Sequence, residues 1–219
     1  MKILDRTYNE SKIKKEFKQV LWIYDFWGRL TERKAMKKVL GMAEIKNGDN
    51  VLDVACGTGE LLKRMVKQNP AGRNTGIDLS PAMLDKARKR LKKLHTENFE
   101  LQQGNALDLD FPDDTFDVLL NNYMVDLLPE SSFNQIAAEF YRVLKPGGRL
   151  VMSTFSFGTK RIHKIWYLMA RLFPGLLTDC RPVAFQPYLE NAGFDVEETL
   201  EISQNTFPTQ VIKAGKKQV

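Results

Sequence analysis

The sequence predicts an α/β fold: a Rossmann-like, seven-stranded, mostly parallel sheet with an antiparallel last strand and helices on both faces. Three observations lead to this prediction. Apolar strand-like segments alternate with amphipathic segments through the middle of the chain, which is typical of a parallel sheet covered by helices. A glycine-rich turn joins the first strand to the following helix. Two strand-like segments around a short turn end the chain, and such a hairpin adds antiparallel pairing.

The elements follow in order from the residue pattern. Helical periodicity predicts helices near residues 10–27, 31–43, 59–68, 81–94 and 131–144. The strands of the alternating part are expected at residues 50–55, 74–78, 99–103, 117–121 and 149–155. The segment 145–148, KPGG, is expected to be a turn between a helix and the fifth strand.

The end of the chain departs from this alternation. A short helix is expected at residues 182–192, closed by Gly193. Strands at 195–202 and 206–214 would then form a hairpin around residues 203–205. Pro208 in the last strand indicates an edge or bulged position, because proline has no N–H for the ladder.

Composition limits the class of protein. With 219 residues, 43% hydrophobic and 27% charged, the chain is not collagen-like, a coiled coil or wholly disordered. Cys56 and Cys180 allow at most one bridge, so we expect a reducing compartment and no disulfide framework. No apolar segment approaches the roughly 20 residues of a spanning helix, and no signal peptide is visible. We therefore expect a cytoplasmic protein, and we expect no metal site.

The positive charge lies in the N-terminal segment. Residues 1–46 contain 12 Lys/Arg and 6 Asp/Glu, so this segment accounts for the whole net charge of +6. The aromatic residues Trp22, Tyr24, Phe26 and Trp27 lie in the same segment. We predict a helical lid at 1–46 on a main domain at 47–219, whose sheet should stay folded without the lid. The lid either docks its aromatic face on the domain or also makes a peripheral contact with an anionic membrane.

The segment 51–62, VLDVACGTGELL, carries the most information about chemistry. Gly57 and Gly59 allow a tight turn between strand and helix and the close approach of a ligand. Asp53 lies on the strand, and Asp78 ends the next strand, 19 residues after Gly59. That separation lets a carboxylate reach the hydroxyls of a bound ribose. We therefore predict an adenosine-type ligand.

Two residues in this turn favour one adenosine ligand over another. Leu62 stands where the dinucleotide fingerprint has its third glycine, and Glu60 at the helix N-terminus would oppose a pyrophosphate. These features disfavour an NAD oxidoreductase. S-adenosylmethionine has ribose hydroxyls, an ammonium and a sulfonium, and it has no phosphate, so it suits this acidic turn better.

Further segments extend the pattern in order along the chain. They are 76–84, GIDLSPAML; 104–106, GNA, with 111–117, FPDDTFD; and 142–150, RVLKPGGRL. With these, the chain resembles the class I S-adenosylmethionine-dependent methyltransferases, within them the group of ubiquinone/menaquinone-biosynthesis and phospholipid N-methyltransferases. The resemblance is close over about residues 47–155 and looser over the terminal hairpin.

The resemblance implies the cofactor contacts. Asp53 and the backbone of 55–59 would hold the methionine part, and Asp78 would bind the ribose hydroxyls. Asn105 would meet the amino edge of adenine, a position at which many relatives have an acidic residue. Asn121 or Asn122 would face the methionine end or the acceptor. The complete expected set is Asp53, Ala55, Cys56, Gly57, Thr58, Gly59, Asp78, Leu79, Met83, Asn105, Ala106, Asn121 and Asn122. Cys56 is expected to be a small packing residue and no nucleophile.

Methyl transfer from a sulfonium needs alignment and the exclusion of water, and it needs a base only where the acceptor must lose a proton. The candidates for such a base are His163, Asp126, Tyr123 and Tyr24. An acceptor insert is expected at about residues 156–182. Its aromatic residues and those of the lid suit a hydrophobic or aromatic acceptor, such as a lipid, a quinone or a small metabolite, unless they serve ordinary helix packing.

Other functions compete with this hypothesis. An RNA or protein methyltransferase could use the basic N-terminal face. Methyltransferases that act on base amines usually have an Asp/Asn-Pro-Pro-aromatic loop after the fourth strand, whereas residues 121–124 read NNYM, so we expect no nucleic-acid partner. A module that binds an adenosine ligand without catalysis is a further alternative.

Overall fold

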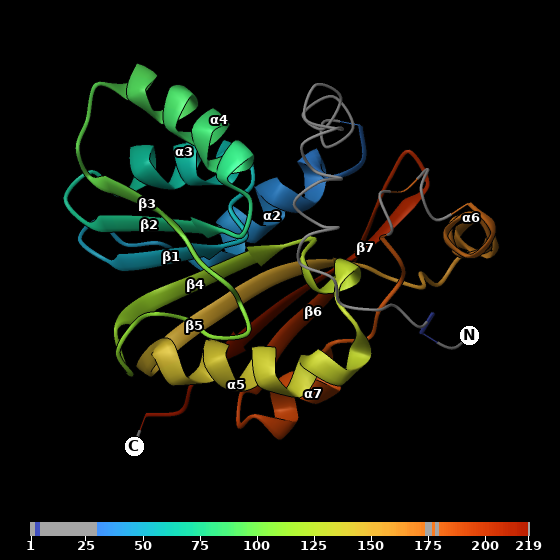
Figure 1. The fold of residues 1–219 in the computed structure, drawn as a ribbon. Helices are drawn as coiled ribbons and strands as arrows, with labels where there is room; N and C mark the ends of the chain where they lie inside the picture. The colour runs from blue at the N-terminus through green and yellow to red at the C-terminus, as the bar shows by residue number, and fades with distance from the viewer. Residues whose placement is uncertain (1–2, 5–29, 174–176, 178–179, 219) are drawn as a thin grey trace.

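The fold was analysed in a computed structural model that describes residues 3–4, 30–173, 177 and 180–218. A seven-stranded sheet in the order β3-β2-β1-β4-β5-β7-β6 forms its centre (Figure 1). Strands β1 to β5 pair in parallel, and β7 runs antiparallel to both β5 and β6. The predicted mostly parallel sheet with an antiparallel last strand is confirmed.

The observed elements agree closely with the expected ones. The strands are β1 (Asn50–Val54), β2 (Arg73–Asp78), β3 (Phe99–Gln103), β4 (Phe116–Asn122), β5 (Leu144–Phe155), β6 (Asp195–Gln204) and β7 (Phe207–Gly215). The α-helices are α2 (Arg33–Ala43), α3 (Glu60–Gln68), α4 (Pro81–Leu91), α5 (Phe133–Val143), α6 (Lys164–Leu172) and α7 (Gln186–Asn191). Short 3-10 turns are η1 (Lys92–Leu94), η2 (Val125–Leu127), η3 (Glu130–Ser132) and η4 (Arg161–His163). The helix expected at 10–27 lies outside the described residues.

Helices cover both faces of the sheet, as Figure 1 shows with α2, α3 and α4 on one side and α5 and α7 on the other. Side chains of each strand alternate between two buried clusters, as the two-residue period of a strand requires. Val51 lies in the cluster with α2 and α3, and its neighbour Leu52 lies in the cluster with α5 and α7. The central strands β1, β4 and β5 are therefore buried on both faces, which explains their largely apolar sequences, whereas β3 and β6 at the sheet edges are more exposed.

The helix α2 belongs to the core, which argues against the expectation that the sheet stays folded without residues 1–46. Ala35, Val39, Met42 and Ala43 are buried in one cluster with Val51. Removing residues 1–46 would expose that face of the sheet. Most of the remaining lid prediction concerns residues 5–29, which lie outside the described part of the chain.

Three other expectations need correction. β5 begins at Leu144 and includes the expected KPGG turn, because the N–H of Gly147 donates to the carbonyl of Lys216 and the N–H of Lys216 donates to that of Gly148. The helix expected at 182–192 is shorter, since it begins only at Gln186 and the N–H of Val183 donates to the carbonyl of Phe155 instead of taking part in a helix.

The position of the last strand also differs from the expectation based on Pro208. β7 lies inside the sheet, between β5 and β6. Pro208 is nevertheless tolerated because the β5 ladder ends at the pair Phe155–Thr209, one residue before the proline is reached. Among the residues that the structure describes, no helix has the length and apolar character needed to cross a membrane.

Candidate functional site

The pocket lies where the sheet changes direction. The chain adds β2 and β3 on one side of β1, and then returns to place β4 on the other side. In open α/β sheets, ligands bind at the carboxyl ends of the strands at this switch point. The pocket is lined by residues that follow β1, β2, β3 and β4: Val54, Ala55, Gly57, Ile77, Asp78, Leu79, Ser80, Met83, Gly104, Asn105, Ala106, Asn122, Tyr123, Met124, Leu127 and Leu128.

Asp78 is fixed by two backbone amides. Its Oδ2 accepts a 2.8 Å hydrogen bond from the N–H of Gly57, and its Oδ1 accepts one of 2.8 Å from the N–H of Ser80. Burial raises the pKa of Asp78, and these two hydrogen bonds oppose the shift. Each carboxylate oxygen has a further lone pair, so the side chain can still accept hydrogen bonds from a ligand.

Two non-glycine residues at the pocket have left-handed backbone conformations. Ala55, directly after β1, has φ of 59°, and Tyr123, directly after β4, has φ of 48°. Such conformations cost free energy for residues with a Cβ, and they concentrate at binding and catalytic sites. Both strands thus turn sharply at the switch point, and the turns open the pocket between them.

Two buried polar atoms near the switch point have no hydrogen-bond partner within the described part of the chain. They are Oδ2 of Asp53 on β1 and Nδ2 of Asn122 at the end of β4. Asn122 lines the pocket, and its Oδ1 accepts a 2.6 Å hydrogen bond from the hydroxyl of Ser153. Burial and, secondarily, the charge of Asp78 raise the pKa of Asp53. A ligand with an acceptor group would complement the amide of Asn122, which lines the pocket.

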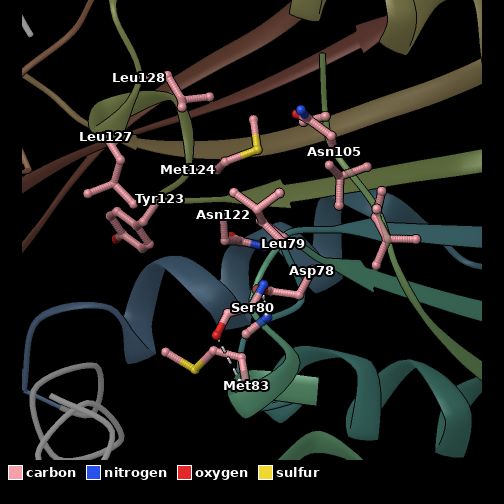
Figure 2. A pocket seen from close by; sticks show the side chains of 16 residues that line it. Asp78, Leu79, Ser80, Met83, Asn105, Asn122, Tyr123, Met124, Leu127 and Leu128 are labelled. Atoms are coloured by element: carbon pink, nitrogen blue, oxygen red, sulfur yellow. Dashed lines mark hydrogen bonds between the residues drawn. The ribbon is translucent and has the colours of Figure 1, made fainter. Parts of the chain in front are cut away.

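The structure brings many of the predicted cofactor residues together around one pocket. Those that line it are Ala55, Gly57, Asp78, Leu79, Met83, Asn105, Ala106 and Asn122. Figure 2 shows Asn122 near the middle of this group, between Asp78 and Ser80 on one side and Leu127 and Leu128 on the other. Asn105 accepts a 3.0 Å hydrogen bond at Oδ1 from the N–H of Leu107, which holds its loop.

The other predicted residues lie behind this surface. Asp53, Cys56, Thr58, Gly59 and Asn121 are not among the lining residues. Burial raises the pKa of the Cys56 thiol, and the charges of Asp53 and Asp78 add to the shift, so the thiol stays protonated. Protonation removes its nucleophilicity, in keeping with a packing role.

The glycine turn has a structural task besides ligand approach. Gly59 has φ of 76°, and a Cβ there would lie 2.9 Å from the Cβ of Ala87 on α4. Because Gly59 has no Cβ, α3 can begin directly against α4. Glu60 pairs with Arg64 at 3.1 Å and does not line the pocket, so its charge acts at the helix end and not on the pocket surface.

The candidates for a proton acceptor occupy different places. Tyr123 lines the pocket, and its hydroxyl lies 2.8 Å from that of Thr209. His163 is buried beside Glu201, with 3.6 Å between Nδ1 and Oε1, and is not a lining residue. Tyr24 lies outside the described residues.

Asp126 belongs to a buried acidic group behind Tyr123. Its Oδ2 accepts from the N–H of Phe155, and its Oδ1 has no hydrogen-bond partner in the described chain. Desolvation raises the pKa of Asp126 to about 7, although Phe155 and the charge of Arg181 oppose the shift. Desolvation, and secondarily Asp126, raise the pKa of Glu32 to about 8. Both carboxyl groups thus have raised pKa values, and neither is among the residues that line the pocket.

Several residues at and behind the pocket were not predicted from the sequence. Glu32 and Arg181, which influence the pKa of Asp126 or are influenced by it, come from distant segments, and neither belongs to a motif. Met124, Leu127 and Leu128 form an apolar wall from η2 and its flanks. The one feature of the sequence that could have indicated these three residues is their position directly after the fourth strand, where the pocket of such a sheet is expected.

Comparison with known proteins identifies relatives of this chain. A family model described as a methyltransferase domain matches residues 45–204. The demethylmenaquinone methyltransferase of Listeria welshimeri is 36% identical over 146 residues, which cover 64% of this chain and 61% of that protein. The match thus spans about three fifths of the length of this curated relative.

Solved structures share the fold at lower identity. A methyltransferase of Haloferax volcanii, solved in complex with the Trm112 methyltransferase activator, has a TM-score of 0.76 at 19% identity and covers 94% of this chain and 98% of its own. An S-adenosylmethionine-dependent methyltransferase of Aquifex aeolicus has a TM-score of 0.65 at 22% identity, covering 96% and 100%.

Proposed function

Because the chain belongs to the class I S-adenosylmethionine-dependent methyltransferases, of the menaquinone/ubiquinone type, we propose that it methylates a hydrophobic, quinone-type ring. The observation that carries this proposal is the chemistry of the pocket wall. Among the described residues that line the pocket, Asp78 alone carries a charge, and Met124, Leu127 and Leu128 present apolar side chains. An uncharged ring fits such a wall, whereas the phosphates of RNA would find no cation there.

The residues present fit the cofactor. The ribose hydroxyls would donate to Asp78, the side chain of Leu79 would pack on the adenine, and Asn105 would meet the adenine edge. The unpartnered Nδ2 of Asn122 lines the pocket and can donate to the carboxylate of an amino acid, whereas the unpartnered Oδ2 of Asp53 lies behind the pocket wall. Bound S-adenosylmethionine supplies an electrophilic methyl group on a sulfonium.

The residues of the chain have to orient the acceptor, exclude water and remove a proton. A ring carbon that gains a methyl group must lose its hydrogen as a proton, and a nucleophilic ring requires the reduced, hydroquinone form of the acceptor. Burial raises the pKa of Tyr123 well above its usual value, so its hydroxyl stays protonated and can donate a hydrogen bond to an acceptor oxygen. Asp126 and Glu32 do not line the pocket, and their pKa values are raised to about 7 and 8; we assign to this pair the acceptance, from behind Tyr123, of the proton that leaves the ring.

The alternative, an RNA or protein acceptor at a basic N-terminal face, concerns a segment most of which lies outside the described residues. No feature of the described pocket favours it. The contact of residues 1–46 with a membrane likewise stays a prediction.

A transfer assay tests the proposed function. The chain is incubated with S-adenosylmethionine labelled in its methyl group and with a short-chain demethylmenaquinone kept reduced by dithionite. We expect label in the quinone, more than tenfold less with Asp126→Asn, and little change with Asp85→Asn, which removes a charge on the exposed surface of α4. Label in added RNA or protein, and none in the quinone, would overturn the acceptor assignment.

A further inference from the structure

The helix α6 carries an apolar stripe on its exposed side. Ile162, Ile165, Leu168, Leu172 and Phe173 are between 42% and 61% exposed, and they are five of the six large hydrophobic residues found exposed in the described part of the chain. Ile165, Leu168 and Leu172 follow one another at intervals of three and four residues, so they lie along one side of the helix. Contiguous exposed apolar surface of this kind marks an interaction site.

The opposite side of α6 anchors it to the protein. Ala170 is fully buried. The indole of Trp166 packs edge-on against Phe207, with 5.1 Å between ring centroids, and its Nε1 donates to the hydroxyl of Thr206 at 3.2 Å. The turn between β6 and β7 therefore holds the helix, and the stripe faces away from it. Figure 1 shows α6 at the outside of the molecule, on the side where β7 begins and away from the C-terminus.

The charge beside the stripe is of one sign. Lys160, Arg161, Lys164 and Arg171 are all exposed, and residues 158–173 contain no Asp or Glu. The nearest acidic neighbour from another element is Glu201 of β6, which already accepts hydrogen bonds from the backbone and the hydroxyl of Thr159. An apolar stripe flanked by cations is complementary to a surface that is apolar within and anionic at its boundary.

We propose that α6 is a docking site for an anionic lipid bilayer: Ile165, Leu168 and Leu172 enter the boundary between headgroups and acyl chains, and Arg161, Lys164 and Arg171 contact the lipid phosphates. The helix follows β5, so it leaves the same edge of the sheet at which β1, β2 and β4 open the pocket. Docking through α6 thus presents this edge to the bilayer. The inference concerns a surface and needs neither the cofactor nor the acceptor.

Vesicle binding of the intact chain tests this inference. Cosedimentation is measured with phosphatidylcholine vesicles and with vesicles that also contain phosphatidylglycerol, at low and high salt. We expect binding to the anionic vesicles that weakens with salt. The triple variant Ile165→Gln, Leu168→Gln, Leu172→Gln should bind more than tenfold more weakly. The triple variant Arg161→Gln, Lys164→Gln, Arg171→Gln should also lose more than tenfold, at about fivefold per charge.

A matched control separates this site from general charge attraction. Lys89→Gln, Lys92→Gln, Lys93→Gln removes the same number of exposed charges on the other basic segment, at α4 and η1, and should bind as the unchanged chain does. All altered side chains are exposed, so the variants should unfold at the same temperature as the unchanged chain. If the apolar variant is destabilised, the comparison of the α6 charge variant with the control variant still tests whether α6 is the docking site.

Three results would overturn the proposal. The first is no binding to anionic vesicles. The second is equal loss in the control and in the α6 charge variant, or loss with Leu30→Gln while the α6 variants still bind. The third is a dimer that the apolar variant converts to a monomer, without vesicle binding, since the stripe would then join two copies of this chain. Each of these leaves the proposed methyl transfer untouched, because that reaction is measured in the absence of vesicles.

Discussion

The side chain of Asn121 on β4 donates a 2.9 Å hydrogen bond from Nδ2 to the carbonyl oxygen of Val54 on β1. The same two residues are partners in the parallel ladder. The bond lies at the last residue of β1, just before the chain turns at Ala55 into the pocket. Asn121 therefore holds the two strands together at the point where their continuations separate, and it does so from behind the pocket.

Asn121→Ala should weaken both the fold and the cofactor site. Loss of a buried hydrogen bond costs about 1–3 kcal/mol of unfolding free energy, and the loosened end of β1 should lower the affinity for S-adenosylmethionine. Asn50→Ala is the matched control, because Asn50 at the other end of β1 donates to the carbonyl of Thr115 at 3.0 Å. Urea unfolding should show a loss for both variants, whereas calorimetry should show weaker binding for Asn121→Ala alone. If both variants bind S-adenosylmethionine with the same affinity, Asn121 does not contribute to the cofactor site.

Asp78→Ala should reduce cofactor affinity strongly. The carboxylate is fixed by Gly57 and Ser80, and hydrogen bonds to a charged group contribute about 1.5–3 kcal/mol, so the dissociation constant should rise about 10- to 150-fold. Asp85→Ala, on the exposed side of α4, serves as the control. Titration calorimetry with S-adenosylhomocysteine measures both. Unchanged affinity of the Asp78 variant would mean that this carboxylate does not hold the ribose.

Gly59→Ala should destabilise the fold. A Cβ at this position would meet Ala87 at 2.9 Å, and the backbone has φ of 76°, so both contact and conformation are unfavourable; we expect a loss of about 1–3 kcal/mol. Gly41→Ala is the opposite case, because Gly41 lies in α2 with nothing within 4 Å of the added Cβ. That variant should gain about 0.5–1 kcal/mol. Similar melting temperatures of the two variants would contradict this reading of the turn.

Asp126 should make stability depend on pH. Its pKa is raised to about 7, first by desolvation, whereas an unfolded aspartate ionises near 4. Between these values the unfolded chain has released its proton and the folded chain has not, so the free energy of unfolding falls as pH rises from about 4 to 7. Asp126→Asn cannot ionise and should gain about 2–4 kcal/mol on the unchanged protein over that interval. The free energy of unfolding is measured by chemical unfolding of both proteins across this pH range. If it depends on pH in the same way for the unchanged protein and for Asp126→Asn, the carboxyl of Asp126 is not desolvated.

Sequence reasoning went furthest where local pattern and fold agree. The apolar strands and the glycine turn at Gly57 predicted the switch point and the place of Asp78, because strand, turn and helix are set by neighbouring residues. Asp53 was chosen from the same pattern, yet its carboxylate lies behind the pocket lining. Which side of a strand end faces a ligand depends on how neighbouring strands turn, and that information is not local.

Contacts between distant segments escaped prediction for the same reason. Glu32 precedes α2 and influences Asp126 only because α2 packs on the sheet near β4 and β5. Pro208 suggested an edge strand, but the length of β5 decides whether its missing N–H matters. The aromatic residues of the insert at about 156–182 were predicted to form a pocket wall, and the exposed stripe of Ile165, Leu168 and Leu172 on α6 was not predicted, because periodicity alone does not say which side of a helix the protein covers.

The most direct test of the central claim is a crystal structure of this chain with S-adenosylhomocysteine. We predict that the ligand lies at the carboxyl ends of β1, β2 and β4, with its ribose hydroxyls on Asp78 and its adenine between Leu79 and Ala106. Its amino-acid end should approach Asn122, and the wall formed by Met124, Leu127 and Leu128 should remain open to an acceptor. A ligand bound elsewhere, or one whose ribose makes no contact with Asp78, would contradict the account.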